Sequence, residues 1–157
     1  METDPGQDGD GGTVGASEMY GTCSEQIAGV LKVVGDSAMV LSYEEDRAFA
    51  ALSLDRFGAI GSSRLDWGGA EELGRCEGFD GGNLRRMVQL YADADELAVV
   101  FWDNLAVPSV ALEAALVAGH AEAVVDTFRA CWIYLTSSEV LVEFQDGEGL
   151  KAGRVPS

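Results

Sequence analysis

The stretch VVFWDNLAVPSVALEAAL, residues 99–116, decides how the rest of the chain is interpreted. Its residues up to Trp102 are apolar, and most are β-branched or aromatic, which is typical of a buried strand. Pro108 has no backbone N–H to donate to a sheet, so the strand cannot continue through it. Ser109 can cap a helix, and the apolar spacing and the alanines that follow favour a helix over 110–128. The stretch therefore predicts a strand, a polar turn and a long helix.

The C-terminal residues change to a period of two, which indicates strands. Three such runs cover 130–138, 139–147 and 148–155, and polar turns at 137–138 and 146–147 separate them. Short turns join antiparallel neighbours. We therefore expect a three-stranded antiparallel meander at this end of the chain.

Upstream of the quoted stretch, a helix is expected to begin after Ser24 and to end at Gly35. The runs 37–43 and 47–55 are interpreted as strands of a hairpin around the acidic turn 44–46. The alanine content of the second run leaves a helix as the alternative there.

The glycine-rich segment 56–82 shows little periodicity and is expected to be irregular, with one helical turn at 70–74. Asn83 can cap a further helix of two or three turns, because apolar side chains form one stripe after it.

These elements predict an α+β fold in which the strands come as hairpins and do not alternate with helices. We expect an antiparallel or mixed sheet with the C-terminal meander and with helices packed on one side. The length of 157 residues suits one domain. Residues 1–18 hold five acids, no base and several glycines, so they are expected to be a flexible tail before a single domain at 19–157.

Charge is the strongest global feature of the chain. Asp and Glu number 27 against 10 Lys and Arg, which gives a net charge of −17. Such a surface repels nucleic acid and anionic lipid and attracts basic proteins. We therefore expect a basic protein as partner, with no nucleic acid and no membrane. The alternative is that the acidity serves only solubility.

The compartment is expected to be the cytoplasm. The chain has no apolar run long enough for a membrane span, and its N-terminus lacks the basic and apolar regions of a signal peptide. The cysteines Cys23, Cys76 and Cys131 are far apart and include no C-x-x-C pair, which favours reduced thiols. Cys131, in an apolar run, is expected in the core.

No motif for catalysis, metal binding or cofactor binding is found. The chain has neither G-x-S-x-G, nor a phosphate-binding loop, nor H-E-x-x-H, nor an EF-hand loop. Its only histidine, His120, falls on or near the apolar stripe of the predicted helix, where a partly buried imidazole bonded to a carbonyl is expected. We expect no cofactor, no metal and no enzyme activity, while a small hydrolase that uses His120 stays open as an alternative.

The turn at Trp102, Asp103 and Asn104 is either a structural corner or an edge where a partner docks. Acidic residues that are predicted to lie in turns are expected to contact the same partner. The candidate partner-binding residues are Glu44, Glu45, Asp46, Asp93, Asp95, Glu96, Trp102 and Asp103.

Several short motifs follow one another in a fixed order over residues 97–155. They are Trp102, Asn104, Leu105, Val107 and Pro108; His120; Trp132 and Tyr134; then Glu143, Phe144, Gly149, Gly153 and Arg154. This order resembles small bacterial immunity proteins of polymorphic and contact-dependent growth-inhibition toxin systems. Asp103 departs from the pattern, which has a small residue there, and the acidic N-terminal tail is additional.

The resemblance implies a cognate inhibitor that binds a toxin domain, and it identifies neither the toxin nor the contact residues. Together with the charge it leads to the hypothesis of a non-enzymatic immunity protein that blocks a basic, nuclease-type toxin domain. An acidic regulatory adaptor and the His120 hydrolase are the alternatives.

Overall fold

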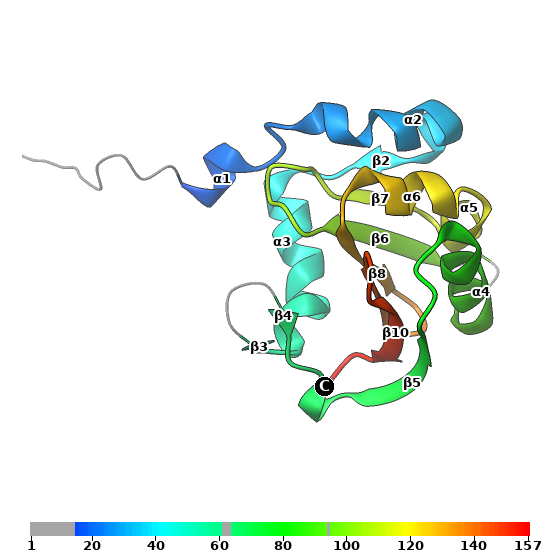
Figure 1. The fold of residues 1–157 in the computed structure, drawn as a ribbon. Coiled ribbons are helices and arrows are strands. Elements are labelled where there is room, and N and C mark those ends of the chain that lie inside the picture. Colours follow the sequence, from blue (N-terminus) through cyan, green and yellow to red (C-terminus); the bar gives the residue numbers. More distant parts are fainter. Residues whose placement is uncertain (1–14, 61–63, 94) are drawn as a thin grey trace, which may run out of the picture.

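A seven-stranded antiparallel sheet runs through the computed structural model, which describes residues 15–60, 64–93 and 95–157 (Figure 1). Its strand order is β2-β7-β6-β8-β9-β10-β5. In this order the strands are Met39–Val40, Val110–Glu113, Leu97–Trp102, Ala130–Leu135, Val140–Gln145, Gly149–Arg154 and Glu71–Cys76. A separate small ribbon pairs β3 (Ala59–Ile60) with β4 (Arg64–Leu65).

The α+β class and the C-terminal meander are confirmed. Strands β8, β9 and β10 follow one another in sequence and pair antiparallel. Strand β6 ends at Trp102, as predicted, and pairs with β8 on one side and with β7 on the other.

Six α-helices accompany the sheet in the described part of the chain: α1 (Ala16–Met19), α2 (Ala28–Val34), α3 (Tyr43–Leu52), α4 (Gly81–Tyr91), α5 (Ala114–Gly119) and α6 (Ala121–Thr127). Short 3-10 turns are η1 (Ser24–Ile27), η2 (Gly35–Ser37), η3 (Leu54–Arg56) and η4 (Trp67–Gly69). The predicted helices after Ser24 and near Asn83 are confirmed, although α4 begins at Gly81 because the Asp80 side chain caps it.

The two faces of the sheet are covered differently. Residues such as Val100, Ile133 and Val142 point to one face, where they form the main core with α2, α4, α5 and α6. We call this the covered face. Four helices pack on it, whereas α3 packs on the opposite face, so the helices are not all on the one side that the sequence predicts. The other face, which we call the open face, is covered in part by α3 and the segment around Phe57 and Trp67 (Figure 1).

The predicted strand over 47–55 is wrong, and the helical alternative is what the structure has. Residues 43–52 form α3 because Ser42 and Glu45 make a reciprocal capping box. The Ser42 hydroxyl accepts from the Glu45 N–H, and the Glu45 carboxylate accepts from the Ser42 N–H. The acidic residues 44–46 therefore lie in the first turn of a helix and not at a hairpin tip.

The predicted helix over 110–128 is also wrong at both its start and its middle. Residues 110–113 form β7, which lies between β2 and β6, so sheet pairing on both edges outweighs the helix propensity of the alanines. The rest is two helices, α5 and α6, which are separated at His120, where φ is −122° and ψ is 34°.

The helical turn expected at 70–74 is replaced by β5, which pairs with β10 at the edge of the sheet. Gly153 of β10 packs against the Trp67 ring, and a Cβ there would lie 2.6 Å from Trp67 Cζ3. Such close packing of a glycine-rich segment cannot be read from its composition.

The chain before α2 is attached to the domain by backbone hydrogen bonds, from the Gly21 and Cys23 N–H groups to the Leu105 and Ala106 carbonyls, and by the Tyr20 side chain. The Tyr20 hydroxyl donates to the Leu41 carbonyl and accepts from the Ser109 N–H, each at 2.9 Å. Residues 1–14 of the predicted tail lie outside the described residues, and the tail's last residues, 16–18, belong to α1. None of the helices described here is both long and apolar enough to span a membrane.

Candidate functional site

The acids at the start of α3 have two different roles. Glu44 and Glu45 are exposed, whereas Asp46 is buried. The Asp46 carboxylate accepts from the Ser109 hydroxyl and forms an ion pair with Arg47 at 2.7 Å. Asp46 therefore joins α3 to the segment before β7, and its side chain is not part of the molecular surface.

The acids before β6 are divided in the same way. Asp93 and Asp95 are exposed, whereas Glu96 is 3% exposed. The Glu96 carboxylate accepts from the N–H groups of Asp93 and Ser138 at 2.9 and 2.5 Å. Burial alone would raise the pKa of Glu96, but these hydrogen bonds outweigh it and lower the pKa.

Trp102 is 5% exposed and belongs to the core of the covered face. Its indole N–H donates to the Val124 carbonyl at 3.1 Å, which fixes α6 on the sheet. Asp103 is half-buried, and burial raises its pKa, with the charge of Glu143 adding to the effect and that of Arg129 opposing it. Trp102 is therefore a core residue, and of these two residues only Asp103 reaches the surface.

The predicted residues do not form one surface. Leu97 and Trp102 mark the two ends of β6, about 17 Å apart at the rise of an extended strand. Asp93 and Asp95 precede the first end, and Asp103 follows the second.

A groove of about 340 Å³, here called the edge groove, opens at the β2 side of the sheet. Its apolar lining residues are Met39, Leu41, Phe49, Leu97, Ala111 and Leu112. Met39 is 60% exposed and Leu97 is 41% exposed, which is unusual for large apolar side chains. The groove therefore presents apolar surface to solvent beside the last strand of the sheet.

Three carboxylates lie around this apolar surface, on Asp36, Glu45 and Glu113, and no lysine or arginine is among the described residues that line the groove. Of the three, the sequence singled out Glu45. Glu113 lies in the part of the predicted helix that forms β7 instead, and Asp36 follows the end of α2 with no motif to mark it. An apolar floor beneath acids alone is complementary to a basic, amphipathic protein surface.

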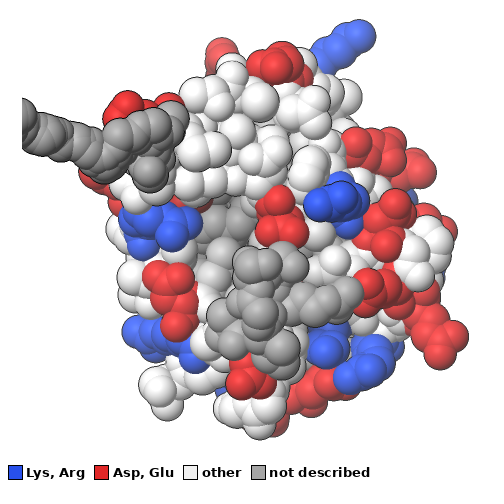
Figure 2. Space-filling model, turned by 60° about the vertical axis from the view of Figure 1, so that its left-hand side comes forward, with Lys and Arg blue, Asp and Glu red and all other residues white. Residues whose placement is uncertain are grey.

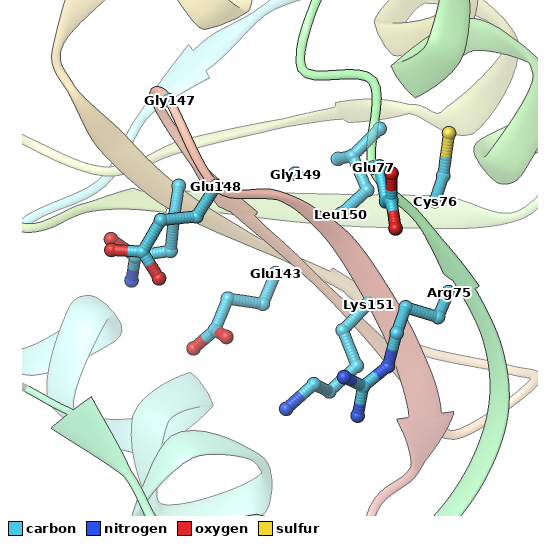
Figure 3. Close-up of a pocket in the computed structure, with 10 residues that line it drawn as sticks. Arg75, Cys76, Glu77, Glu143, Gly147, Glu148, Gly149, Leu150 and Lys151 are labelled. Carbon is cyan, nitrogen blue, oxygen red and sulfur yellow. The ribbon is translucent and has the colours of Figure 1, made fainter.

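A second and larger depression of about 500 Å³, here called the polar hollow, lies over β9, β10 and β5 (Figure 3). Its charged lining residues are Arg75, Glu77, Glu143, Glu148 and Lys151. Figure 3 shows the side chains of Glu143, Lys151 and Arg75 projecting to the same side of the sheet. Glu143 and Lys151 come from adjacent strands of the predicted meander, whereas Arg75 and Glu77 come from a distant segment of the sequence.

Basic and acidic side chains are interspersed on the side of the molecule that carries α3 (Figure 2). At the β5 edge of the sheet, Arg75 forms an ion pair with Glu72 at 2.8 Å and Arg154 forms one with Glu71 at 3.3 Å. Ion pairing leaves the net charge of −17 unchanged, so a basic partner would meet a predominantly acidic molecule.

His120 is half-buried at the junction of α5 and α6 and lines neither the edge groove nor the polar hollow. Within the part of the chain that the structure describes, no hydrogen bond joins its imidazole to a carboxylate or a hydroxyl, and no cluster of three metal-ligating side chains is found.

The three cysteines form no disulfide, and Cys131 is buried as predicted, which raises the pKa of its thiol.

No protein-family model matches this chain, and no curated protein resembles it significantly in sequence. Its function therefore has to be inferred from the edge groove, the polar hollow and the distribution of charge.

Proposed function

We propose that this chain is a non-enzymatic inhibitor that binds and neutralises a basic toxin domain, in the manner of the immunity proteins that its C-terminal half resembles. The edge groove is the observation that carries the proposal. Exposed apolar side chains supply contact energy, and the carboxylates of Asp36, Glu45 and Glu113 select a partner with lysine and arginine around an apolar patch.

The net charge of −17 supports the same mechanism at longer range. Electrostatic attraction raises the rate at which a basic domain meets the inhibitor, before the groove makes specific contacts. A nuclease-type toxin holds phosphate with basic side chains, and an acidic surface seated on those side chains excludes the nucleic acid by charge and by volume. No bond is made or broken by the inhibitor itself.

The inhibitor would act in the cytoplasm, where a nuclease-type toxin reaches its substrate. Thiols stay reduced in that compartment, which suits three cysteines that form no disulfide.

The test is a growth assay in which toxin domains encoded by neighbouring genes are expressed with and without this chain. We expect protection by the natural chain and loss of protection when Asp36→Asn, Glu45→Gln and Glu113→Gln are combined. Glutamine at position 45 can still complete the capping box, so α3 should be retained in this variant.

A matched control removes three exposed acids elsewhere, by Glu25→Gln, Glu122→Gln and Asp126→Asn. This control has the same net charge as the groove variant and should still protect. Growth arrest that persists despite soluble natural chain would refute the proposal. Equal loss of protection in both triple variants would refute the assignment of the groove.

A further inference from the structure

The polar hollow is built on a row of four side chains that face one another across neighbouring strands. Trp132 of β8 lies opposite Glu143 of β9, Glu143 lies opposite Lys151 of β10, and Lys151 lies opposite Arg75 of β5. The row therefore runs from an aromatic ring to a carboxylate and then to two cations on one face of the sheet. Figure 3 shows its last three members, Glu143, Lys151 and Arg75.

Glu143 is the buried acid of this row. It is 8% exposed, and its Oε2 accepts from the Trp132 indole N–H at 2.8 Å, while its carboxylate still lines the hollow. No lysine or arginine of the described chain lies within ion-pair distance of it, although Lys151 is its direct neighbour across the strands. A buried carboxylate without a cation is costly, so a cationic group in the hollow would stabilise it.

Lys151 and Arg75 are two cations that lie directly opposite each other on β10 and β5. Like charges directly across a strand pair repel each other, yet these two stand together in a chain that has few bases. The Lys151 ammonium lies 5.1 Å from the centre of the Trp67 ring, and Arg75 donates to the Glu72 carboxylate at 2.8 and 3.1 Å. Glu72 therefore already supplies the anion for Arg75. The Lys151 ammonium has no carboxylate within ion-pair distance among the described residues, so it is the cation available to an anion in the hollow.

We infer that the polar hollow binds a small zwitterion, with its anionic group at Lys151 and its cationic group at Glu143. The volume of about 500 Å³ lies within the range of small-molecule sites. The hollow shares no lining residue with the edge groove, so this binding is independent of the proposed capture of a toxin domain.

Heteronuclear NMR titration of the full chain at low ionic strength tests the inference. The probes are ω-amino acids of increasing length, namely glycine, β-alanine, γ-aminobutyrate and δ-aminovalerate, with acetate and ethylammonium as probes of single charge. We expect one zwitterion to give saturable shifts of amides in β9, β10 and β5, with an affinity at least about tenfold above that of acetate or ethylammonium.

Two variants separate the ends of the ligand. Glu143→Gln keeps an acceptor for Trp132 and should reduce the affinity for the zwitterion to that for acetate. Lys151→Gln should reduce it to that for ethylammonium. Lys32→Gln, at an exposed position of α2, should leave it unchanged. Spectra of the free variants establish that each one is folded.

The inference fails if no probe gives saturable shifts, if the shifts map to the edge groove, or if folded Glu143→Gln and Lys151→Gln bind as tightly as the natural chain. None of these results bears on protection against a toxin, which is measured with the groove variant. The two proposals can therefore fail separately.

Discussion

Glu96 joins the turn before β6 to the turn between β8 and β9 through a single carboxylate. Both of its oxygens accept hydrogen bonds, from the Asp93 N–H and from the N–H and hydroxyl of Ser138. Because the ionised form makes these bonds, the folded state favours ionisation, and the pKa of Glu96 is lowered.

Replacing Glu96 by glutamine should therefore destabilise the protein in a pH-dependent way. One oxygen becomes an amide group that cannot accept, so we expect a loss of roughly 2–3 kcal/mol in the free energy of unfolding at neutral pH. A carboxylate with a lowered pKa contributes its full stability above the unfolded pKa of about 4.3, and that contribution is lost as pH falls through the lower, folded pKa. Urea unfolding of both proteins across the acidic range measures the difference.

Asp95→Asn is the control for this variant, because Asp95 is exposed in the same turn. It should change the free energy of unfolding by no more than about 0.5 kcal/mol. A Glu96→Gln difference that stays constant down to strongly acidic pH would contradict the role assigned to the charge.

Sequence reasoning could not separate buried acids from exposed ones in the candidate site. Asp46 bonds to a serine 63 residues away, and Glu96 bonds to one 42 residues away. In the sequence, a buried acid cannot be distinguished from an exposed one, because the hydrogen-bond partner that offsets the cost of burial comes from a distant segment. Glu44, Glu45, Asp93 and Asp95 do lie on the surface, as a charge pattern alone predicts.

Strand β5 depends on the absence of a side chain in its neighbour. Gly149 at the start of β10 has a φ of 124°, and a Cβ there would lie 2.3 Å from the carbonyl oxygen of Cys76 at the end of β5. Only glycine therefore permits both the backbone conformation and the approach of the two strands at this point.

Gly149→Ala should separate the end of β5 from β10 and lower the free energy of unfolding. We expect faster hydrogen exchange of the β5 amides than of those in β6 and β8, since β5 is an edge strand that pairs, among the described strands, with β10 alone. Exchange measured by NMR or mass spectrometry checks this.

Gly29→Ala on α2 provides the matched control. An added Cβ meets no atom within 4 Å there, and alanine favours a helix over glycine by up to about 1 kcal/mol. The prediction is wrong if Gly149→Ala leaves exchange in β5 as slow as in the control.

At the scale of elements, the sequence was informative where pairing is local. The meander was predicted because β8, β9 and β10 are neighbours in both sequence and space. Strand β7 was missed because its four residues are helix-compatible and become a strand only between β2 and β6. The capping box of α3 was a local signal that could have distinguished the helix from the predicted strand.

The whole molecule carries far more negative charge than the three arginine ion pairs of the described residues, with Asp46, Glu71 and Glu72, neutralise. The net charge follows from composition alone. The arrangement of acids around apolar side chains in the edge groove does not. That arrangement needs the sheet order, in which segments around Asp36, Leu97 and Glu113 meet.

Binding of a basic toxin domain should weaken as salt rises, because screening acts on charges that are exposed before contact. We expect the dissociation constant to increase about tenfold or more between low and physiological ionic strength, mainly through a slower association rate. Surface plasmon resonance at several salt concentrations measures both rates. An affinity that does not depend on salt would favour the alternative in which the acidity serves only solubility.

The unequal covering of the two sheet faces also affects how such a molecule can evolve. Mutations on the covered face disturb packing among α4, α5, α6 and the sheet, and selection for foldability removes most of them. The rim of the open face can change with little loss of stability. A lineage can therefore acquire new specificities along one side of the sheet while the other side preserves its architecture.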